Sequence, residues 1–336
     1  MTTRGPQQKP VRATGSGVPV DIATPAIDRR PRPSAHRTPL VTRQAQMRLG
    51  LLLVAPVMVM VIVFFITPLI NAVYYAFVDF DGLTANPPFV GIDNFVEMFT
   101  DERVWAALQN NAIWIIIGTI APLVIGLALA LLMWNVRRGG SVYRVVFFLP
   151  YVLPQVVIGV VWGWIYDPIR GWLNKALEFV GLGALQTGWL GNADTALYAV
   201  LVTAIWATAG FVFVIFLSAL GNVDMELVDA SMLDGANTLQ RLWYVILPQI
   251  MPVFLMVTTI TLIGGFSVFD IIFVMTGGGP AGASDVLGTY AYSQAVARHR
   301  SSSGTTLALL ITVLAIPFTI ALNRLQRRLS MQGSGA

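Results

Sequence analysis

The sequence has no cysteine, only two histidines, and 11% charged residues among its 336 positions. The absence of cysteine excludes a disulfide framework, a cysteine-ligated zinc site and a thiol nucleophile. The two histidines, His36 and His299, lie in separate polar segments, so a histidine-based metal site is not expected. A soluble domain has about 25% charged residues, whereas 56% of this chain is hydrophobic and its mean hydropathy is +0.70. The composition indicates an integral membrane protein.

Six stretches without a charged residue are each long enough to cross a bilayer, which requires about 20 residues of helix. They are residues 49–78, 112–136, 145–166, 195–223, 242–269 and 301–323. Pro56, Pro68 and Asn71 predict a tilt or a kink in the first of them. The predicted fold class is therefore an all-α integral membrane protein with six transmembrane helices, which places both termini on the same side.

The distribution of cations predicts the orientation, because cytoplasmic loops carry an excess of lysine and arginine. With the N-terminus inside, the inner segments hold 16 of the 21 cations and the outer segments hold the other five. Both termini and the loop between the fourth and fifth spans are therefore expected in the cytoplasm. The outer loops, 79–111 and 167–194, are long, and their tryptophans predict some order.

The two ends of the chain differ in composition from the membrane domain, which is expected over residues 46–325. Residues 1–45 are rich in proline, arginine, glutamine, serine and threonine, which predicts a disordered basic tail. Such a tail is expected to meet anionic lipid rather than nucleic acid. No apolar stretch precedes Leu49, so a cleavable signal peptide is not expected. Residues 326–336 are expected to form a short cytoplasmic tail.

The loop 224–248 between the fourth and fifth spans, which we call the hook, is too polar to cross a membrane. If residues 226–247 are helical, apolar residues repeat at spacings of three and four and form one stripe, namely Met225, Val228, Met232, Ala236 and Leu239. Asp234-Gly235 is expected to bend the hook, and Pro248 stands where the next apolar helix begins. An interfacial helix on lipid headgroups is the alternative, but such helices are usually rich in cations. The hook instead has one cation, Arg241, and four carboxylates, and this composition favours docking in a groove on another protein.

The hook resembles the EAA loop of the permeases of bacterial ABC importers. The resemblance rests on Asp229-Ala230-Ser231, on Gly235 three residues later, and on Val245-Ile246-Leu247-Pro248 after nine more. Asp229 replaces the usual Glu and Ser231 the second Ala, while Asp234, Gly235 and Ala236 match. In that family this loop is the coupling helix that seats in a cleft of the cytoplasmic ATPase. The resemblance thus implies ATPase coupling by Glu226, Asp229, Ala230, Ser231, Asp234, Gly235, Ala236 and Pro248.

Other segments resemble the sugar-importer branch of the type I permeases. They are residues 89–95, 148–154, 162–168, 171–174 and 269–280, the last reading FDIIFVMTGGGP. The resemblance covers about residues 46–325 in order. It implies a bacterial inner-membrane protein with a second, homologous permease, two copies of an ATPase and an extracytoplasmic solute-binding protein as partners. It also implies that ATP and magnesium bind to the ATPase, and that this chain binds no cofactor.

A solute pathway needs aromatic and polar side chains in the middle of spans, where polar groups are costly unless they face a cavity or a partner. The fourth and fifth spans offer several, including Thr203, Trp206, Thr208, Phe211 and Ser267, although serine and threonine also commonly bond to their own helix. The family lines its pocket from the same two spans. The resulting candidates are Ala204, Trp206, Ala207, Thr208, Phe211, Phe266, Ser267 and Asp270. Ala204 stands where maltose-type members have an amide, so a maltose-like solute is not expected.

Asp270 is the one carboxylate inside the apolar run that ends the fifth span. It can bond solute hydroxyls, pair with a cation of the second permease, or reach water at the headgroups. These three alternatives remain open from the sequence.

The chain carries no catalytic constellation. A GxxxxGK[ST] phosphate loop is absent, and the glycines 277–279 precede Pro280 without a lysine, so a turn is expected there. The predicted function is a permease subunit of an ATP-driven carbohydrate importer, with glycerol phosphate or another polyol derivative as the alternative solute. An ion-coupled secondary transporter would need ionisable residues deep in its spans, and the spans have none apart from Asp270. A membrane scaffold would account for the spans but not for the hook.

Overall fold

The computed structural model describes residues 43–134, 136 and 139–333. The chain divides between Val59 and Met60 into two units, which are described separately. The first unit, where described, is the start of helix α1 (Arg43–Val61). The predicted tail 1–45 lies outside the described residues except for the first three residues of this helix.

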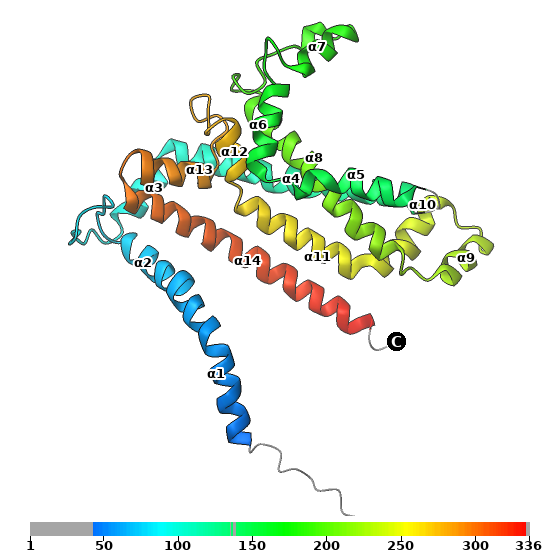
Figure 1. Ribbon diagram of the computed structural model, residues 1–336, viewed down its shortest axis with the longest axis horizontal. Helices are drawn as coiled ribbons and strands as arrows, with labels where there is room; N and C mark the ends of the chain where they lie inside the picture. The colour runs from blue at the N-terminus through cyan, green and yellow to red at the C-terminus, as the bar shows by residue number, and fades with distance from the viewer. Residues whose placement is uncertain (1–42, 135, 137–138, 334–336) are drawn as a thin grey trace, which may run out of the picture. The chain divides into compact units, whose positions relative to one another are not determined.

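The second unit begins with the end of α1, a π-helical turn (Ile62–Ile66) and helix α2 (Thr67–Tyr75) (Figure 1). The π-helical turn precedes Pro68, whose ring would clash with the carbonyl four residues earlier in a regular helix. In the wider turn, the Thr67 hydroxyl and backbone N–H both donate to the Ile62 carbonyl. A second π-helical turn (Leu242–Ile246) precedes Pro248 in the same way. In the first span, for which a tilt or a kink is predicted, the described residues contain a π-helical turn.

Within the described ranges, five helical stretches are long and apolar enough to cross a membrane. They are Gly50–Tyr75, Glu102–Met133, Ala196–Leu220, Thr238–Phe266 and Ser301–Gln326. Two shorter helices, α5 (Gly140–Val152) and α6 (Gln155–Ile165), meet at 97° and form either a broken sixth span or a re-entrant loop. The all-α fold with up to six spans is confirmed, but the third predicted stretch, 145–166, is not one straight helix. Leu153 is extended because it precedes Pro154, and the helix direction changes there.

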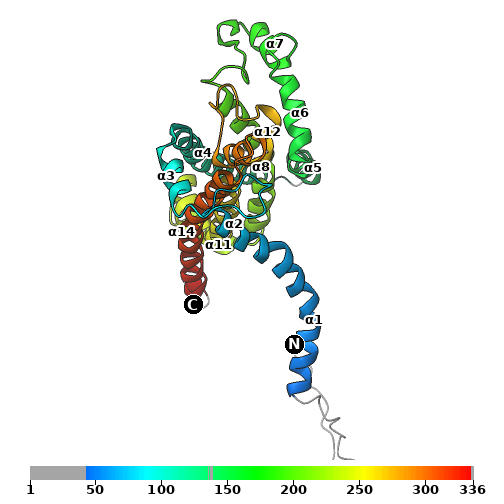
Figure 2. The same cartoon turned by 90° about the vertical axis from the view of Figure 1, so that its left-hand side faces the viewer.

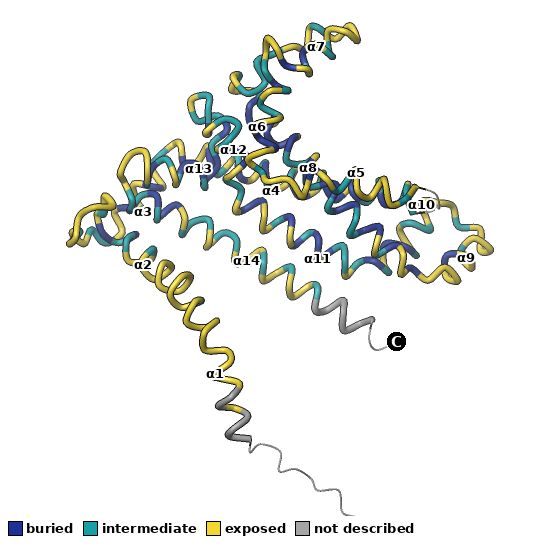
Figure 3. Tube along the Cα trace, in the orientation of Figure 1, coloured by how far each residue is buried: buried dark blue, intermediate teal, exposed yellow. Residues whose placement is uncertain are grey.

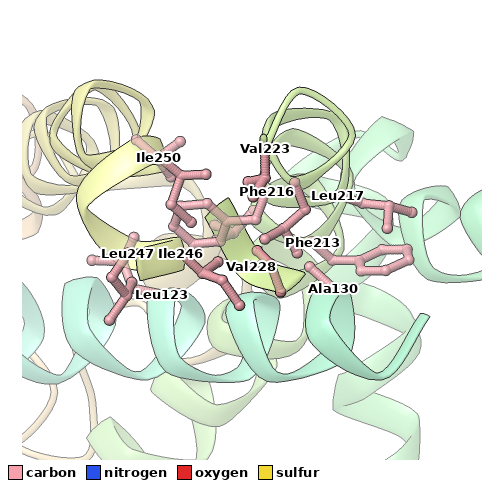
Figure 4. Packing of buried hydrophobic residues seen from close by; sticks show 13 residues of the cluster. Leu123, Ala130, Phe213, Phe216, Leu217, Val223, Val228, Ile246, Leu247 and Ile250 are labelled. Atoms are coloured by element: carbon pink, nitrogen blue, oxygen red, sulfur yellow. The ribbon is translucent and has the colours of Figure 1, made fainter. Parts of the chain in front are cut away.

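The helices of the second unit pack around α8 (Ala196–Leu220), which is buried along most of its length (Figure 3). It lies against α4 (Glu102–Met133), α5 and α11 (Leu247–Phe266). Phe213 and Phe216 are fully buried in a cluster with residues of α4, the hook and α11 (Figure 4). Gly126 of α4 faces Val212, and Gly210 of α8 faces the Phe147 carbonyl of α5. Small residues let the backbones approach closely, as in other membrane helix pairs.

The two ends of this packed unit carry different elements. One end carries the hook, which contains α9 (Met225–Leu233) and α10 (Thr238–Arg241). The opposite end carries α3 (Asp93–Thr100), α12 (Asp270–Met275) and α13 (Leu287–Tyr292) (Figure 1). Helix α14 (Ser301–Gly333) begins at this opposite end and continues into the predicted tail 326–336.

The two long loops contain the order that their tryptophans predict. Residues 79–111 contain α3 and the first ten residues of α4, which starts at Glu102 rather than at 112 because Asp101 caps it. The buried Asn94 amide donates to the carbonyls of Ala76 and Val78 and fixes α3 to the end of α2. Residues 167–194 contain α7 (Trp172–Phe179) and a short 3-10 turn (Gly183–Leu185).

The glycines 277–279 form the expected turn. Gly277 and Gly278 have φ of 61° and 87°, a backbone region that glycine adopts easily. A Cβ on Gly278 would lie 1.9 Å from a carboxylate oxygen of Asp285, so a side chain there would displace that carboxylate.

Candidate solute cavity and coupling hook

The hook consists of α9, a turn at Gly235 and α10, so residues 226–247 do not form one continuous helix. Helix α10 continues through the π-helical turn into α11. The Asp224 carboxylate accepts from the Glu226 backbone N–H at 2.9 Å and starts α9. The chain turns at Gly235, whose φ of +81° only glycine adopts without strain. Asn237 and Gln240 then form a reciprocal capping box that starts α10. The bend predicted at Asp234-Gly235 is therefore present, and the capping residues explain why a second helix follows.

Most apolar side chains of the hook are exposed. Of the predicted stripe, Val228 is buried against the core, while Met225, Met232 and Leu239 are 48%, 46% and 63% exposed. Leu233, Trp243 and Tyr244, which sequence reasoning missed, add to the exposed apolar area. Of the residues implied in coupling, Glu226, Asp229, Ala230, Asp234 and Gly235 are exposed, while Ser231 and Ala236 are partly buried. The hook therefore exposes carboxylates together with apolar side chains.

The hook is tied to α11 by a side-chain bridge. Gln249 accepts from the Asp224 backbone N–H at 2.8 Å, and its own amide donates to the Val245 carbonyl at 3.1 Å. Pro248 lies in the first turn of α11, directly after the π-helical turn that accommodates its ring and its missing N–H. The Gln249 side chain thus links Asp224, at the start of the hook, to Val245, near its end.

A cavity of about 310 Å³ lies among the helices of the second unit. Its walls come from α4, from α5 and α6 at their bend, from α8, from the second half of α11 and from the segment that enters α12. The residues that line it are Trp114, Gly118, Tyr151, Gln155, Ala204, Ile205, Thr208, Phe211, Ile260, Thr261, Gly264, Gly265, Ser267, Val268, Phe269, Asp270 and Ile271. The cavity opens at the surface of the chain, so its wall is incomplete on one side.

Five of the predicted pathway residues meet in this cavity and three do not. Ala204, Thr208, Phe211, Ser267 and Asp270 line it. The other three lie elsewhere. Ala207 is fully buried between helices, Trp206 packs edge-on against Trp162, and Phe266 packs against Phe318 beside a separate apolar cavity.

The cavity combines aromatic faces with a few polar groups. Tyr151 and Phe211 stack with ring centroids 4.5 Å apart. The hydroxyls of Thr261 and Ser267 donate to carbonyls of their own helix, as such residues commonly do. Asp270 is exposed to the cavity, and among its described lining residues it is the only charged one.

Sequence reasoning missed Trp114, Tyr151 and Gln155 as cavity residues. Tyr151 and Gln155 flank the Leu153-Pro154 break, which turns both toward the cavity. The X-Pro rule could have signalled that break. Trp114 comes from α4, far away in sequence, and no local pattern points to it.

A polar cluster joins α3, α4 and α13 at the end opposite the hook. The Tyr290 hydroxyl donates to the Asp101 carboxylate and accepts from the Gln294 amide. Burial, together with the hydrogen bond to Asp101 and its charge, raises the pKa of Tyr290 to about 12. Arg300 pairs with Glu97 nearby. These bonds fix the start of α14 relative to α3.

The sequence of residues 122–331 matches the family model described as the binding-protein-dependent transport system inner membrane component. The chain belongs to this family. It is an ABC-importer permease subunit that lies in the membrane, and its relatives are permease subunits rather than enzymes.

Individual relatives agree with this assignment. The permease is 30% identical to the probable ABC transporter permease protein YurN of Bacillus subtilis (strain 168), over 84% of this chain and 96% of that protein. It is 31% identical to the diacetylchitobiose uptake system permease protein NgcF of Streptomyces coelicolor (strain ATCC BAA-471 / A3(2) / M145), over 82% of this chain and 80% of that protein. Its fold matches a solved bacterial ABC transporter involved in the import of the acidic polysaccharide alginate, with a TM-score of 0.74 and 22% identity. The match covers 84% of this chain and 96% of that chain.

Proposed function

We propose that this permease forms one half of the membrane pathway of an ATP-driven importer for an uncharged carbohydrate. The observation that supports it most directly is the cavity where Trp114, Tyr151 and Phe211 come together with Thr208, Gln155 and Asp270. Aromatic rings offer apolar faces to sugar rings, an amide both donates hydrogen bonds to hydroxyls and accepts them, and a carboxylate accepts them. The diacetylchitobiose relative is consistent with such a solute.

The charge of the cavity argues against the alternative solute, glycerol phosphate. An anion needs a cation or several N–H donors, and the described lining residues include no lysine, arginine or histidine. Asp270 would repel a phosphate. A neutral sugar leaves the carboxylate free to accept hydroxyl hydrogen bonds.

The remaining partners follow from the family and from the hook. A second, homologous permease would close the open side of the cavity, and an extracytoplasmic binding protein would deliver the solute. Two ATPase subunits would bind ATP and magnesium and seat the hook, which the cation distribution predicts to lie in the cytoplasm together with both termini. Closure of the ATPase dimer would then move the hook and change which side of the membrane the cavity faces.

The experiment that tests the coupling role is a gentle-detergent pull-down of the permease, followed by mass spectrometry and solute uptake. Gly235→Pro cannot adopt the φ of +81° and should distort the exposed hook without disturbing the spans. We expect the variant to reach the membrane, to retain the second permease, and to lose the ATPase and transport.

A matched control is available at Gly139, which also has a positive φ, 77°, but lies between α4 and α5 outside the hook. Gly139→Pro should retain the ATPase. Full uptake by Gly235→Pro, or a wild-type permease that never co-purifies with an ATPase, would contradict the proposal.

The solute class is tested separately with Asp270→Asn. If the solute is a neutral sugar, loss of the charged acceptor should raise KM, by about tenfold for one hydrogen bond to a charged group. Loss of repulsion would instead improve uptake of an anionic solute, so an increase in glycerol phosphate transport would support the alternative.

A further inference from the structure

Trp114 of α4 is a buried tryptophan whose ring N–H has no hydrogen-bond partner among the described residues. It is 5% exposed, and a tryptophan that is buried usually finds a partner for this donor. Trp105 and Trp189 show the usual arrangement, because their ring N–H groups donate to a backbone carbonyl at 2.9 Å and to an amide oxygen at 2.8 Å. The exception at Trp114 therefore calls for an explanation.

The solute cavity provides that explanation, because Trp114 lines it. Where the chain is described, the fully enclosed polar side-chain atoms without a partner belong to Thr119, Arg241 and Gln294. The Trp114 nitrogen is not one of them, so its N–H is accessible although the residue as a whole is buried. The ring N–H is thus a donor that is open toward the cavity.

A backbone acceptor lies one helical turn away on the same wall of the cavity. Pro122, inside α4, has no N–H, so the Gly118 carbonyl lacks the hydrogen bond that residue 122 donates in a regular helix. Gly118 also lines the cavity and has no side chain to cover its backbone. A Cβ on Gly118 would lie 3.5 Å from the Trp114 ring nitrogen, so the two residues are neighbours. A carbonyl without its helix bond needs another partner within a membrane protein.

Helix α4 supplies a wall of the cavity that is separate from the bend between α5 and α6. In Figure 2, α8 lies between α4 and this bent pair, and α8 contacts all three helices. The bend brings Tyr151 and Gln155 to the cavity, whereas α4 brings Trp114 and Gly118. A solute in the cavity therefore meets one donor and one acceptor on α4 besides the polar groups of the other walls.

We propose that Trp114 and Gly118 form a subsite on α4 that recognises one hydroxyl group of the solute. The hydroxyl oxygen accepts a hydrogen bond from the Trp114 ring N–H, and the hydroxyl donates its own hydrogen to the Gly118 carbonyl. A hydroxyl suits this pair because it donates and accepts at once. An ether oxygen only accepts, and an ionised carboxylate or phosphate oxygen would face the carbonyl as a second acceptor.

The inference rests on the proposed function, in which the solute is an uncharged carbohydrate, and it adds a requirement to that function. The solute must carry a free hydroxyl at the position held against α4. A sugar that is deoxygenated or methylated at this position is therefore a poor substrate.

Two substitutions remove the two halves of the subsite separately. Trp114→Phe keeps an aromatic face but removes the N–H. Pro122→Ala restores the N–H of residue 122, which then pairs with the Gly118 carbonyl inside the helix, and it changes no residue that lines the cavity. Each substitution should lower the rate of uptake by roughly two- to tenfold, the effect of one neutral hydrogen bond.

Pro317→Ala is the matched control for the proline variant. Pro317 also lies inside a long helix, α14, and the carbonyl four residues earlier belongs to Val313, which does not line the cavity. This control should transport like the wild type. Alanine is more favourable than proline in a helix interior, so Pro122→Ala should fold at least as stably as the wild type.

The experiment is uptake of tritiated sugars by the assembled transporter with its binding protein in proteoliposomes. The probes are glucose, galactose, mannose, xylose and their common disaccharides, followed by the monodeoxy analogues of the sugar that is taken up. Removal of the recognised hydroxyl from the sugar should lower wild-type uptake to the level of Trp114→Phe and should have no further effect in that variant. A general loss of packing would instead lower the uptake of every analogue alike.

Unchanged uptake of the transported sugar by both Trp114→Phe and Pro122→Ala would overturn the subsite and leave the proposed function standing. An equal loss for every deoxy analogue in Trp114→Phe would have the same meaning. Wild-type uptake of glycerol phosphate, with none of the neutral sugars transported, would overturn both.

Discussion

Replacing Gly210 by alanine should force α5 and α8 apart at the wall of the solute cavity. A Cβ on Gly210 would lie 1.7 Å from the carbonyl oxygen of Phe147 and 2.7 Å from its carbon. Ordinary contact begins at 3.4 Å, so the backbones would have to separate by about 1.7 Å. The obstacle is backbone rather than a flexible side chain, so no rotamer change relieves it.

The expected magnitude follows from what that separation disrupts. Overpacking in a close-packed interior typically costs about 1–3 kcal/mol, and a backbone clash places this variant at the upper end, about 3 kcal/mol. The same movement would separate Phe211 from Tyr151, whose rings stack 4.5 Å apart in the cavity, and Phe213 from Phe147. Gly210→Ala should therefore lower both the stability of the permease and its solute uptake.

The assay is unfolding of the purified permease in detergent, followed by tryptophan fluorescence, beside uptake in proteoliposomes. Gly163→Ala is the matched control, because Gly163 lies in α6 with no atom within 4 Å of an added Cβ. Alanine favours a helix over glycine by about 0.5–1 kcal/mol, so this control should be neutral or slightly stabilising. A Gly210→Ala variant as stable and as active as Gly163→Ala would refute the packing of α5 on α8.

The remaining predictions concern the polar groups at the end opposite the hook. Tyr290→Phe removes the hydrogen bond to Asp101 and should lower the free energy of unfolding by about 1–3 kcal/mol. Because the Tyr290 pKa is raised from 10.0 to about 12, its contribution is fully present below pH 10 and is lost as the pH rises toward 12, so the variant should lack this alkaline loss in a pH series of unfolding curves. Burial raises the pKa of Asp285 above 3.8, so its stabilising contribution is present below pH 3.8 and lost as the pH rises through the raised pKa. Asp285→Asn should remove that acid-range dependence, and an unchanged pH profile would contradict the burial of this carboxylate.

The spans could be predicted from sequence because the membrane imposes one simple rule. Every backbone polar group must be paired within the chain, so charge-free runs of about 20 residues become helices. The rule fails where a run has the right composition but a break inside it. The third predicted stretch reads as one span, yet Leu153 is extended ahead of Pro154 and the helices meet at 97°.

The cavity could be predicted only in part because its walls depend on tertiary packing. Helix α8 is apolar all round and buried by neighbours on several sides, so periodicity does not tell which face points inward. That is why Thr208 and Phe211 reach the cavity while Ala207 is buried between helices. The resemblance to the family pointed to two helices that line the cavity, α8 and α11, but not to Trp114 and Tyr151 from elsewhere in the chain.

The proposed coupling has a mechanical basis in the connection between hook and cavity. Helix α8 enters the hook at its C-terminal end, and α11 leaves the hook at its N-terminal end, with Gln249 joining the two connections. The 20 residues of α11 correspond to about 30 Å of helix at 1.5 Å per residue, and its far end supplies Thr261 and Gly264 to the cavity wall. The same two helices thus hold the hook at one end and form the cavity at the other. Under the proposed coupling, a displacement of the hook would therefore be transmitted to the cavity wall through α8 and α11.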